Sequence, residues 1–268
     1  MEFLFEILKA VLAEQILQFN LSADFMEMFR VVIQLGAILA VVVLYFQKLW
    51  PFCRDNGRDT GVARYVRWPI MRMWFKIIVA CIPAAVLGIL LDDWMDEHLY
   101  NSIVVALMLI VYGIAFILIE RRPRPPKVTK LSRITYKNAL AVGGWQVLSL
   151  IPGTSRSGST ILGGMMCGLS RPCAAQFTFF LAIPVMAGAS LLKLVKFFAK
   201  GNAFAFNEVV ILLVGCLVAF VVSIAAIRFL MDYVKRHSFT VFGWYRIVLG
   251  VIVLAVWAVQ QFTAVPAA

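Results

Sequence analysis

Long apolar runs separated by short charged segments are the main pattern along this chain. A helix rises 1.5 Å per residue, so roughly 20 apolar residues cross the hydrocarbon core of a bilayer. Six runs approach or reach this length: residues 29–47, 73–91, 102–119, 177–198, 208–228 and 243–262. The pattern predicts an all-α polytopic membrane protein with about six transmembrane helices.

A further apolar stretch, residues 139–169, differs from these six because PGTSRSG interrupts it in the middle. Pro152, Gly153 and Gly158 favour the end of a helix at this point. Neither flank is long enough to cross a bilayer alone. We therefore predict a re-entrant helical hairpin, whose irregular turn is buried in protein or lines a water-filled cavity.

The composition supports a membrane protein and excludes several other classes. Hydrophobic residues make up 62% of the 268 residues and charged residues only 15%, whereas a soluble domain carries about 25% charged residues. Nucleic-acid binding is disfavoured, because the basic residues lie between apolar runs without interleaved aromatic residues. The five cysteines form no CxxC pair and lie far from both histidines in sequence, so a zinc-finger type of metal site has no support.

The charges between the apolar runs predict the orientation in the membrane. The net charge of +11 is concentrated in basic segments, and basic loops face the cytoplasm. The acidic segment DDWMDEHLYN, residues 92–101, is expected on the outer side. It is separated by one predicted helix from each of two basic segments, so the assignment is self-consistent. The segments expected in the cytoplasm are residues 48–72, 120–137 and 228–242.

A weak internal repeat relates residues 22–40 to residues 170–190 at an offset of 148, with Ser22 matching Ser170 and Phe29 matching Phe177. The loop charges give the two copies opposite directions through the membrane, so we predict an inverted-topology repeat, an architecture that places ligand sites at the interface of its halves. The expected organisation is one membrane domain, residues 1–268, made of a truncated first half (1–119), a basic cytoplasmic loop (120–138) and a second half (139–268) with the re-entrant signature at 139–169.

The stretch PGTSRSGST, residues 152–160, carries the candidate chemistry. A guanidinium such as that of Arg156 costs roughly 2.5 kcal/mol or more at the centre of a membrane helix, so it should face protein or water and have a partner. Backbone N–H groups made available by the glycines, the N-terminus of a helix expected to start near Ser159, and the arginine fork all favour a phosphate-like anion. Three hydroxyls add donors: Ser155, Ser157 and Thr160. The alternative is a tight turn packed through glycine and serine, with Arg156 extended to the membrane interface.

The segment GGWQVLSLIPGTSRSGST, residues 143–160, resembles the second signature of the bacterial undecaprenyl-pyrophosphate phosphatase family, also called the bacitracin-resistance family. Residues 29–42, 177–189 and 245–250 also resemble that family, and the resemblance covers nearly all of the chain from about residue 20 onward. It implies a plasma-membrane enzyme that removes the terminal phosphate from a C55 polyprenyl pyrophosphate, at a site facing the outer side. The product is the carrier lipid of peptidoglycan synthesis, and bacitracin sequesters the substrate.

The resemblance also implies roles for residues of the signature. Arg156 and Ser155 are expected to be catalytic, with Arg156 neutralising charge during phosphoryl transfer. A divalent cation, magnesium or calcium, is implied by the family alone, and its ligands in this chain are unknown. The residues expected to bind the substrate are Gln146, Gly153, Ser157, Gly158 and Thr160.

The first signature of the family is absent from this chain. It runs Glu-Gly-any-Thr-Glu and then Pro-Ser-Ser-Thr-Gly-His, but the repeat offset points to residues 4–12, which read LFEILKAVL. Neither His98 nor His237 is expected to replace the missing histidine, because both lie in charged segments between the runs. The acids nearest to the gap are Glu14, Asp24 and Glu27.

Hydrolysis of a pyrophosphate needs a base or nucleophile and usually a metal, so we expect hydrolysis to be strongly reduced or absent in this chain. A non-catalytic binder or translocator of polyprenyl phosphates is the alternative. An intramembrane serine protease acting through Ser157 is disfavoured, because no histidine lies on a predicted span.

Overall fold

The computed structural model describes residues 22–54, 64–121 and 125–263. Within these residues every regular element is a helix, and the predicted all-α polytopic fold is confirmed. Six helical segments are long and apolar enough to cross a membrane: Asp24–Leu44, Trp68–Leu91, Ser102–Arg121, Arg171–Ala199, Phe206–Arg236 and Thr240–Gln261. Each overlaps one of the six predicted spans. The inverted repeat itself stays a prediction.

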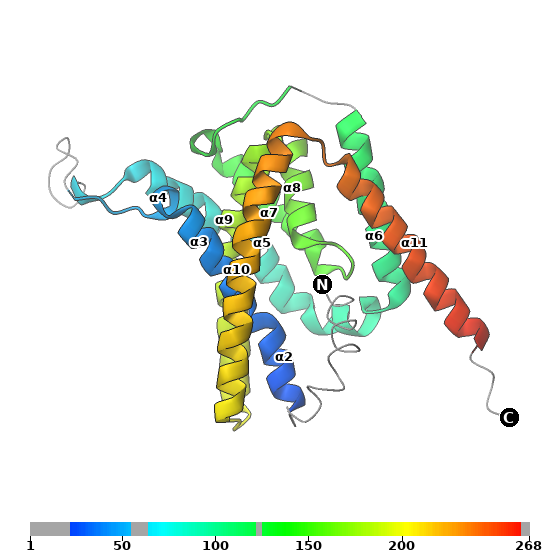
Figure 1. The fold of residues 1–268 in the computed structure, drawn as a ribbon. Helices are drawn as coiled ribbons and strands as arrows, with labels where there is room; N and C mark the ends of the chain where they lie inside the picture. Colours follow the sequence, from blue (N-terminus) through cyan, green and yellow to red (C-terminus); the bar gives the residue numbers. More distant parts are fainter. Residues whose placement is uncertain (1–21, 55–63, 122–124, 264–268) are drawn as a thin grey trace. The chain divides into compact units, whose positions relative to one another are not determined.

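The helices are longer than the apolar runs, because a helix continues past the apolar core into the charged ends. The first predicted span is an exception, since breaks at Ile33 and Tyr45 divide it among three consecutive helices. In chain order (Figure 1) the α-helices are α2 (Ala23–Val32), α3 (Gln34–Leu44), α4 (Phe46–Leu49), α5 (Trp68–Leu99), α6 (Ser102–Arg121), α7 (Tyr136–Val147), α8 (Arg156–Met166), α9 (Arg171–Ala199), α10 (Phe206–Arg236) and α11 (Thr240–Thr263).

Contacts between residues divide the chain into two compact units. The first holds the described residues of Met1–Leu39 together with Met186–Val222, and the second holds Ala40–Val185 and Ser223–Ala268. The whole PGTSRSGST signature therefore lies in the second unit. The division into repeat halves at residues 119 and 139 was based on sequence similarity and loop charge, not on contacts, and it stays a prediction.

In the first unit, α2 packs against the second part of α9. Phe25, Met28 and Val32 of α2 form a buried cluster with Phe197. Ion pairs reinforce this packing, since Glu27 pairs with Lys193 and Asp24 with Lys200. The two acids nearest to the missing signature, among those that the structure describes, are thus held by lysines.

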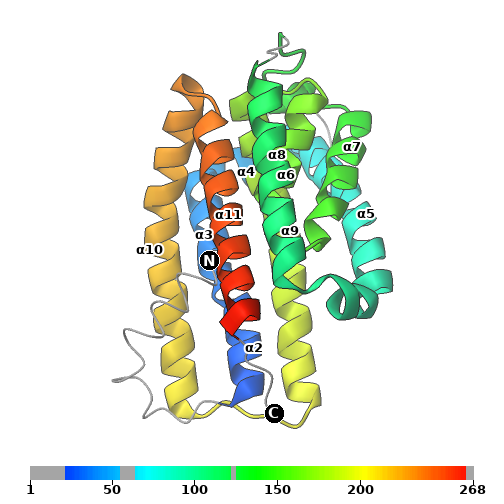
Figure 2. The same cartoon turned by 90° about the vertical axis from the view of Figure 1, so that its right-hand side faces the viewer.

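In the second unit, α6 and α11 lie side by side in both views (Figures 1 and 2). Gly113 of α6 and Gly243 of α11 make this close approach possible. A Cβ atom built on either glycine would lie 2.7 Å from the carbonyl oxygen of the other. Small residues are the usual means by which membrane helices bring their backbones together. The packing fixes which α11 side chains reach the signature.

The basic segments meet at one end of the second unit. The ammonium group of Lys76, near the start of α5, lies 5.8 Å from the ring of Tyr136 at the start of α7. At the end of α6, the buried carboxylate of Glu120 pairs with Arg171 of α9 and accepts the backbone N–H of Phe239, just before α11, at 3.0 Å. The loops that carry most of the positive charge therefore share one end of this unit.

Candidate active site

The signature segment folds as a hairpin of two short helices. α7 has 12 residues and α8 has 11, so they measure about 18 and 16 Å, well short of the roughly 30 Å hydrocarbon core. Asn138 donates its backbone N–H to the Thr135 hydroxyl at 3.1 Å, which caps the start of α7. A turn over residues 148–155 joins the helices. The predicted helical hairpin at residues 139–169 is confirmed, with α7 beginning earlier, at Tyr136.

Gly153 shapes the turn of this hairpin. Its φ of 82° lies in the left-handed region that favours glycine. A Cβ atom on Gly153 would lie 2.7 Å from the Cα of Val105, three residues after α6 begins at Ser102. The neighbouring Thr154 hydroxyl is buried and has no hydrogen-bond partner among the described residues. The turn therefore rests against the end of α6 that lies away from the basic segments, with one unsatisfied hydroxyl.

Ser155 caps α8, which begins at Arg156, three residues before the predicted start near Ser159. Its extended backbone stops the helix from beginning earlier, and its side-chain oxygen accepts the Gly158 N–H at 3.2 Å. The Ser155 and Ser157 hydroxyls lie 3.1 Å apart. Capping by Ser155 leaves the N–H groups of Arg156 and Ser157 without partners inside the helix, so the first turn of α8 offers free donors and the positive end of the helix dipole.

Arg156 occupies the first position of α8 and is half-buried. Burial lowers the pKa of the Arg156 guanidinium below its ordinary value, because its charged form loses contact with water. An arginine nevertheless stays protonated at neutral pH. No carboxylate of the described residues forms an ion pair with Arg156, so this charge is available for an anionic ligand.

Thr160 and Gln146 lie in the packed interior of the hairpin. The Thr160 hydroxyl donates to the carbonyl oxygen of Arg156 at 3.0 Å and accepts from the Thr178 hydroxyl at 2.9 Å. Gln146 is 2% exposed. The structure therefore brings Thr160 within one helical turn of Arg156, in contact with α9. The roles of the predicted site residues in binding stay predictions.

Arg246 on α11 is a candidate that the sequence analysis missed. Its Nη2 atom lies 3.4 Å from the position of a Cβ atom on Gly158, in the first turn of α8. Its Nη1 atom is buried and has no hydrogen-bond partner among the described residues. The signal in the sequence was a lone arginine within an apolar run, which is rare in a membrane helix because of its cost. Arg156 in the first turn of α8 and Arg246, whose guanidinium lies beside Gly158, thus both belong to the start of this helix.

Ser159 ties this helix turn to its neighbours. It is fully buried, and its hydroxyl donates to the carbonyl oxygen of Trp145 on α7. The hydroxyls of Ser159 and Tyr112, on α6, lie 3.2 Å apart. The first turn of α8 is therefore fixed against both α6 and α7, which preorganises the donors around it.

The described histidines and acids lie apart from the signature or already have partners. The His98 ring contacts the carbonyl oxygen of Trp94 at 3.0 Å, and the His237 ring stacks on Tyr233 with centroids 4.5 Å apart. In the part of the chain that the structure describes, no three His, Cys, Asp or Glu residues gather as a metal site. Glu14 and residues 4–12, where the first signature would be expected, lie outside the described residues.

Comparison with known proteins bears on this site. The model of the family described as bacitracin resistance protein BacA matches residues 9–252. The undecaprenyl-diphosphatase of Enterococcus faecalis (strain ATCC 700802 / V583) is 56% identical over 253 residues, which are 92% of this chain and 88% of the relative. The undecaprenyl-diphosphatase of Lactococcus lactis subsp. lactis (strain IL1403) is 53% identical over 247 residues, 91% of this chain and 87% of the relative. That of Streptococcus thermophilus (strain ATCC BAA-250 / LMG 18311) is 56% identical over 252 residues, 93% of this chain and 85% of the relative.

Proposed function

Because the chain belongs to the family of the bacitracin resistance protein BacA, we propose that it is an undecaprenyl-diphosphatase. In this reaction water attacks the terminal phosphorus atom of undecaprenyl pyrophosphate. The bond from that phosphorus to the bridging oxygen breaks, and inorganic phosphate and undecaprenyl phosphate are released. The product is the carrier lipid of peptidoglycan synthesis. Since bacitracin sequesters the pyrophosphate form, its removal accounts for resistance.

The observation that supports this proposal most strongly is that Arg156 lies in the first turn of α8 and that the Arg246 guanidinium lies beside Gly158 of the same turn. Arg156 and Arg246 lie on different helices, and no described carboxylate pairs with either of them. A pyrophosphate carries several negative charges and suits such a pair. Donors that are fixed before the reaction stabilise the charge that develops on the transferred phosphoryl group and on the leaving oxygen. The free N–H groups of α8 and the Ser157 hydroxyl add to them.

The described residues supply binding and charge stabilisation, but no acid or histidine beside Arg156 that could activate water. Weak turnover therefore stays a prediction for this chain. The divalent cation that the family implies is also part of the proposal, although the described residues do not fit it, since they form no cluster of three ligands.

Removal of divalent cations separates binding from turnover. We expect a chelator such as EDTA to leave the affinity of the purified protein for undecaprenyl pyrophosphate within about twofold, because arginines hold the headgroup. Phosphate release tests the cation separately, because a fall in release with EDTA would place the ligands of the cation outside the described residues. Both are measured on the same preparation. Loss of lipid binding with EDTA, restored by added magnesium, would show that the headgroup is held through a metal.

We also propose that the site opens to the outer side of the plasma membrane. The basic segments gather at one end of the second unit, and loops rich in lysine and arginine face the cytoplasm. The turn at Gly153 contacts Val105, only three residues from the opposite end of α6. The headgroup would therefore approach from the side away from the basic segments.

The test of the activity is phosphate release from undecaprenyl pyrophosphate by the purified protein with divalent cation. We expect release that is weak in the wild-type chain and falls further, by about 10²–10³, in Arg156→Ala, the range for loss of one stabilising donor. Arg228→Ala, at an exposed position of α10, is the matched control and should keep the wild-type rate. Tight lipid binding without release, or transfer of the lipid between leaflets of liposomes, would instead favour a binder or translocator.

A further inference from the structure

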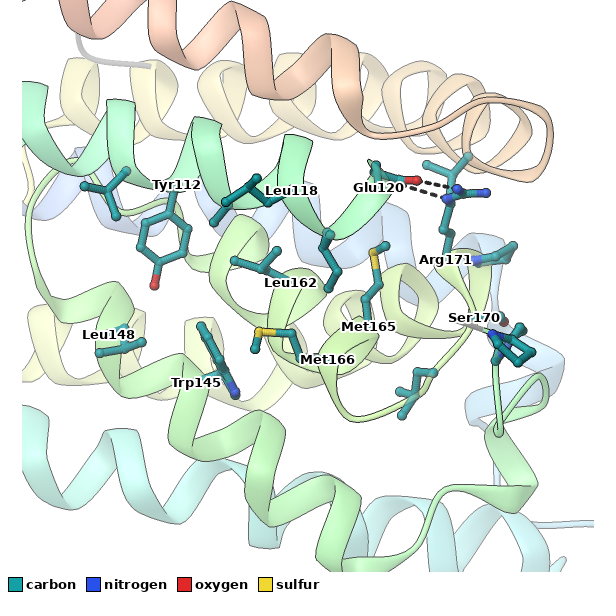
Figure 3. A pocket seen from close by; sticks show the side chains of 18 of the residues that line it. Tyr112, Leu118, Glu120, Trp145, Leu148, Leu162, Met165, Met166, Ser170 and Arg171 are labelled. Carbon is teal, nitrogen blue, oxygen red and sulfur yellow. Dashed lines mark hydrogen bonds and ion pairs between the residues drawn. The ribbon is translucent and has the colours of Figure 1, made fainter. Parts of the chain in front are cut away.

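A cavity of about 990 Å³ lies between α6, α7 and α8 in the second unit (Figure 3). This is at the upper end of the range of roughly 300–1,000 Å³ for small-molecule sites. Its wall is mostly apolar, with Ala115 and Leu118 from α6 and Leu162, Met165 and Met166 from α8. It follows the thirteen residues of α6 from Met108 to Glu120, whose Cα atoms span about 18 Å. The cavity is therefore long enough for a chain-like ligand.

One end of this cavity reaches the proposed active site. Tyr112 and Trp145 both line it, and both contact Ser159: the Tyr112 hydroxyl lies 3.2 Å from the Ser159 hydroxyl, and the Trp145 carbonyl oxygen accepts a hydrogen bond from it. Ser159 is one residue from Gly158, beside which the Arg246 guanidinium lies. The apolar cavity thus begins at two residues that contact Ser159, which follows Gly158 and lies three residues after Arg156 on α8.

The other end of the cavity has its charges already paired. Glu120 and Arg171 form an ion pair that Figure 3 shows at this end, and Lys235 pairs with Asp232 at 2.9 Å. Arg156 and Arg246 have no such acidic partner among the described residues. The distribution of charge therefore gives the cavity a direction: an anionic headgroup belongs at the α8 end, and an apolar chain extends toward Glu120.

We propose that this cavity holds the first part of the polyprenyl chain of the lipid whose pyrophosphate is bound at α8. The inference rests on the proposed function, because it takes the same lipid as the ligand. Leu118 and Met166 line the cavity and are 58% and 57% exposed. The polyprenyl chain can therefore enter the cavity from the bilayer side, between α6 and α8. Flexible methionine side chains suit a branched chain that bends.

A side chain that fills the cavity should weaken lipid binding modestly, and only for ligands that carry a polyprenyl chain. Lipid tails are as apolar as the wall of the cavity, so the polyprenyl chain gains little hydrophobic free energy when it leaves the bilayer. Van der Waals contact between the polyprenyl chain and the cavity wall therefore decides its binding. Ala115→Trp should place an indole in the middle of the cavity. We expect it to weaken binding of undecaprenyl pyrophosphate severalfold and to leave binding of inorganic pyrophosphate, which has the headgroup and no chain, unchanged.

The experiment compares the affinities of these two ligands for the full chain in detergent micelles. Ile114→Trp is the matched control, since Ile114 precedes Ala115 on α6, is 45% exposed and does not line the cavity. Met166→Trp, at an exposed lining position, gives a second test in case Ala115→Trp fails to fold. Retention of wild-type affinity for undecaprenyl pyrophosphate in both cavity variants would overturn the inference. Failure of the proposed function has a different result, because the wild-type protein would then bind neither ligand in an Arg156-dependent way.

Discussion

Arg156 is part of the first turn of α8, Arg246 reaches that turn from α11, and neither arginine has a carboxylate partner among the described residues. At the scale of the residue, this unbalanced positive charge is the main chemical feature of the molecule. A buried donor without a partner, such as Arg246 Nη1, costs free energy that a bound anion recovers. Gly153 supports the arrangement, because the turn that presents Arg156 depends on a residue that accepts a positive φ.

Gly153→Ala should destabilise the turn. A non-glycine residue in the left-handed region costs roughly 1–2 kcal/mol, and the added methyl group would also overlap with α6 at Val105. We expect a lower midpoint of thermal unfolding and weaker binding of undecaprenyl pyrophosphate. Gly144→Ala is the control, because nothing lies within 4 Å of a Cβ atom there. Equal unfolding midpoints in the two variants would show that the turn does not need glycine.

The chemistry at Arg156 could be predicted from sequence because its partners are local. Glycines and hydroxyls within a few residues of one arginine identify an anion site, whatever the rest of the chain does. Arg246 could not be found in this way. It is 90 residues from Arg156, and only the close packing of α6 on α11 through Gly113 and Gly243 brings it to Gly158. That packing is a tertiary contact between segments far apart in the sequence. An isolated arginine in an apolar run does not show which residues it will contact.

At the scale of the element, α8 is a short helix whose start decides its function. Ser155 fixes that start, and its serine side chain was a visible N-cap signal. The prediction of a start near Ser159 was wrong because it gave more weight to Gly158 as a breaker than to Ser155 as a cap. With the earlier start, Arg156 and Ser157 occupy the first turn, where backbone N–H groups lack partners.

Substitutions at Ser155 separate capping from anion binding. Ser155→Ala removes the cap and should lower the free energy of unfolding by about 1 kcal/mol. Ser155→Asp keeps a capping side chain, so stability should be retained, but its negative charge should repel a bound pyrophosphate. Chemical denaturation and lipid binding are measured on both variants. Tight pyrophosphate binding by Ser155→Asp would mean that the anion lies elsewhere.

At the scale of the whole molecule, the loop charges and the helix order were sufficient to predict six spans and an orientation. The six spans are confirmed, and the orientation stays a prediction. Transmembrane spans can be predicted from hydropathy and charge because a span depends on the composition of its own segment. The division at Ile33 and the two compact units were not predicted, since they depend on contacts between distant segments.

The orientation can be tested with cysteines on the two sides. Cys53 lies in the basic segment 48–72 and is partly exposed, so in intact cells it should resist a maleimide that cannot cross membranes. Asn101→Cys, in the acidic segment, should be labelled. The variant is made after the other cysteines are replaced, and permeabilised cells provide the control for reactivity. Labelling of Cys53 in intact cells would reverse the proposed orientation.

A double-mutant cycle on lipid affinity is the decisive experiment on the two arginines. Binding of undecaprenyl pyrophosphate is measured for the wild-type protein, Arg156→Ala, Arg246→Ala and the double variant. If both arginines hold one headgroup, each single variant should lose at least about tenfold in affinity, and the two losses should not add, because residues that share a partner are coupled. Wild-type affinity in Arg246→Ala, or strictly additive losses, would contradict a pyrophosphate held between α8 and α11.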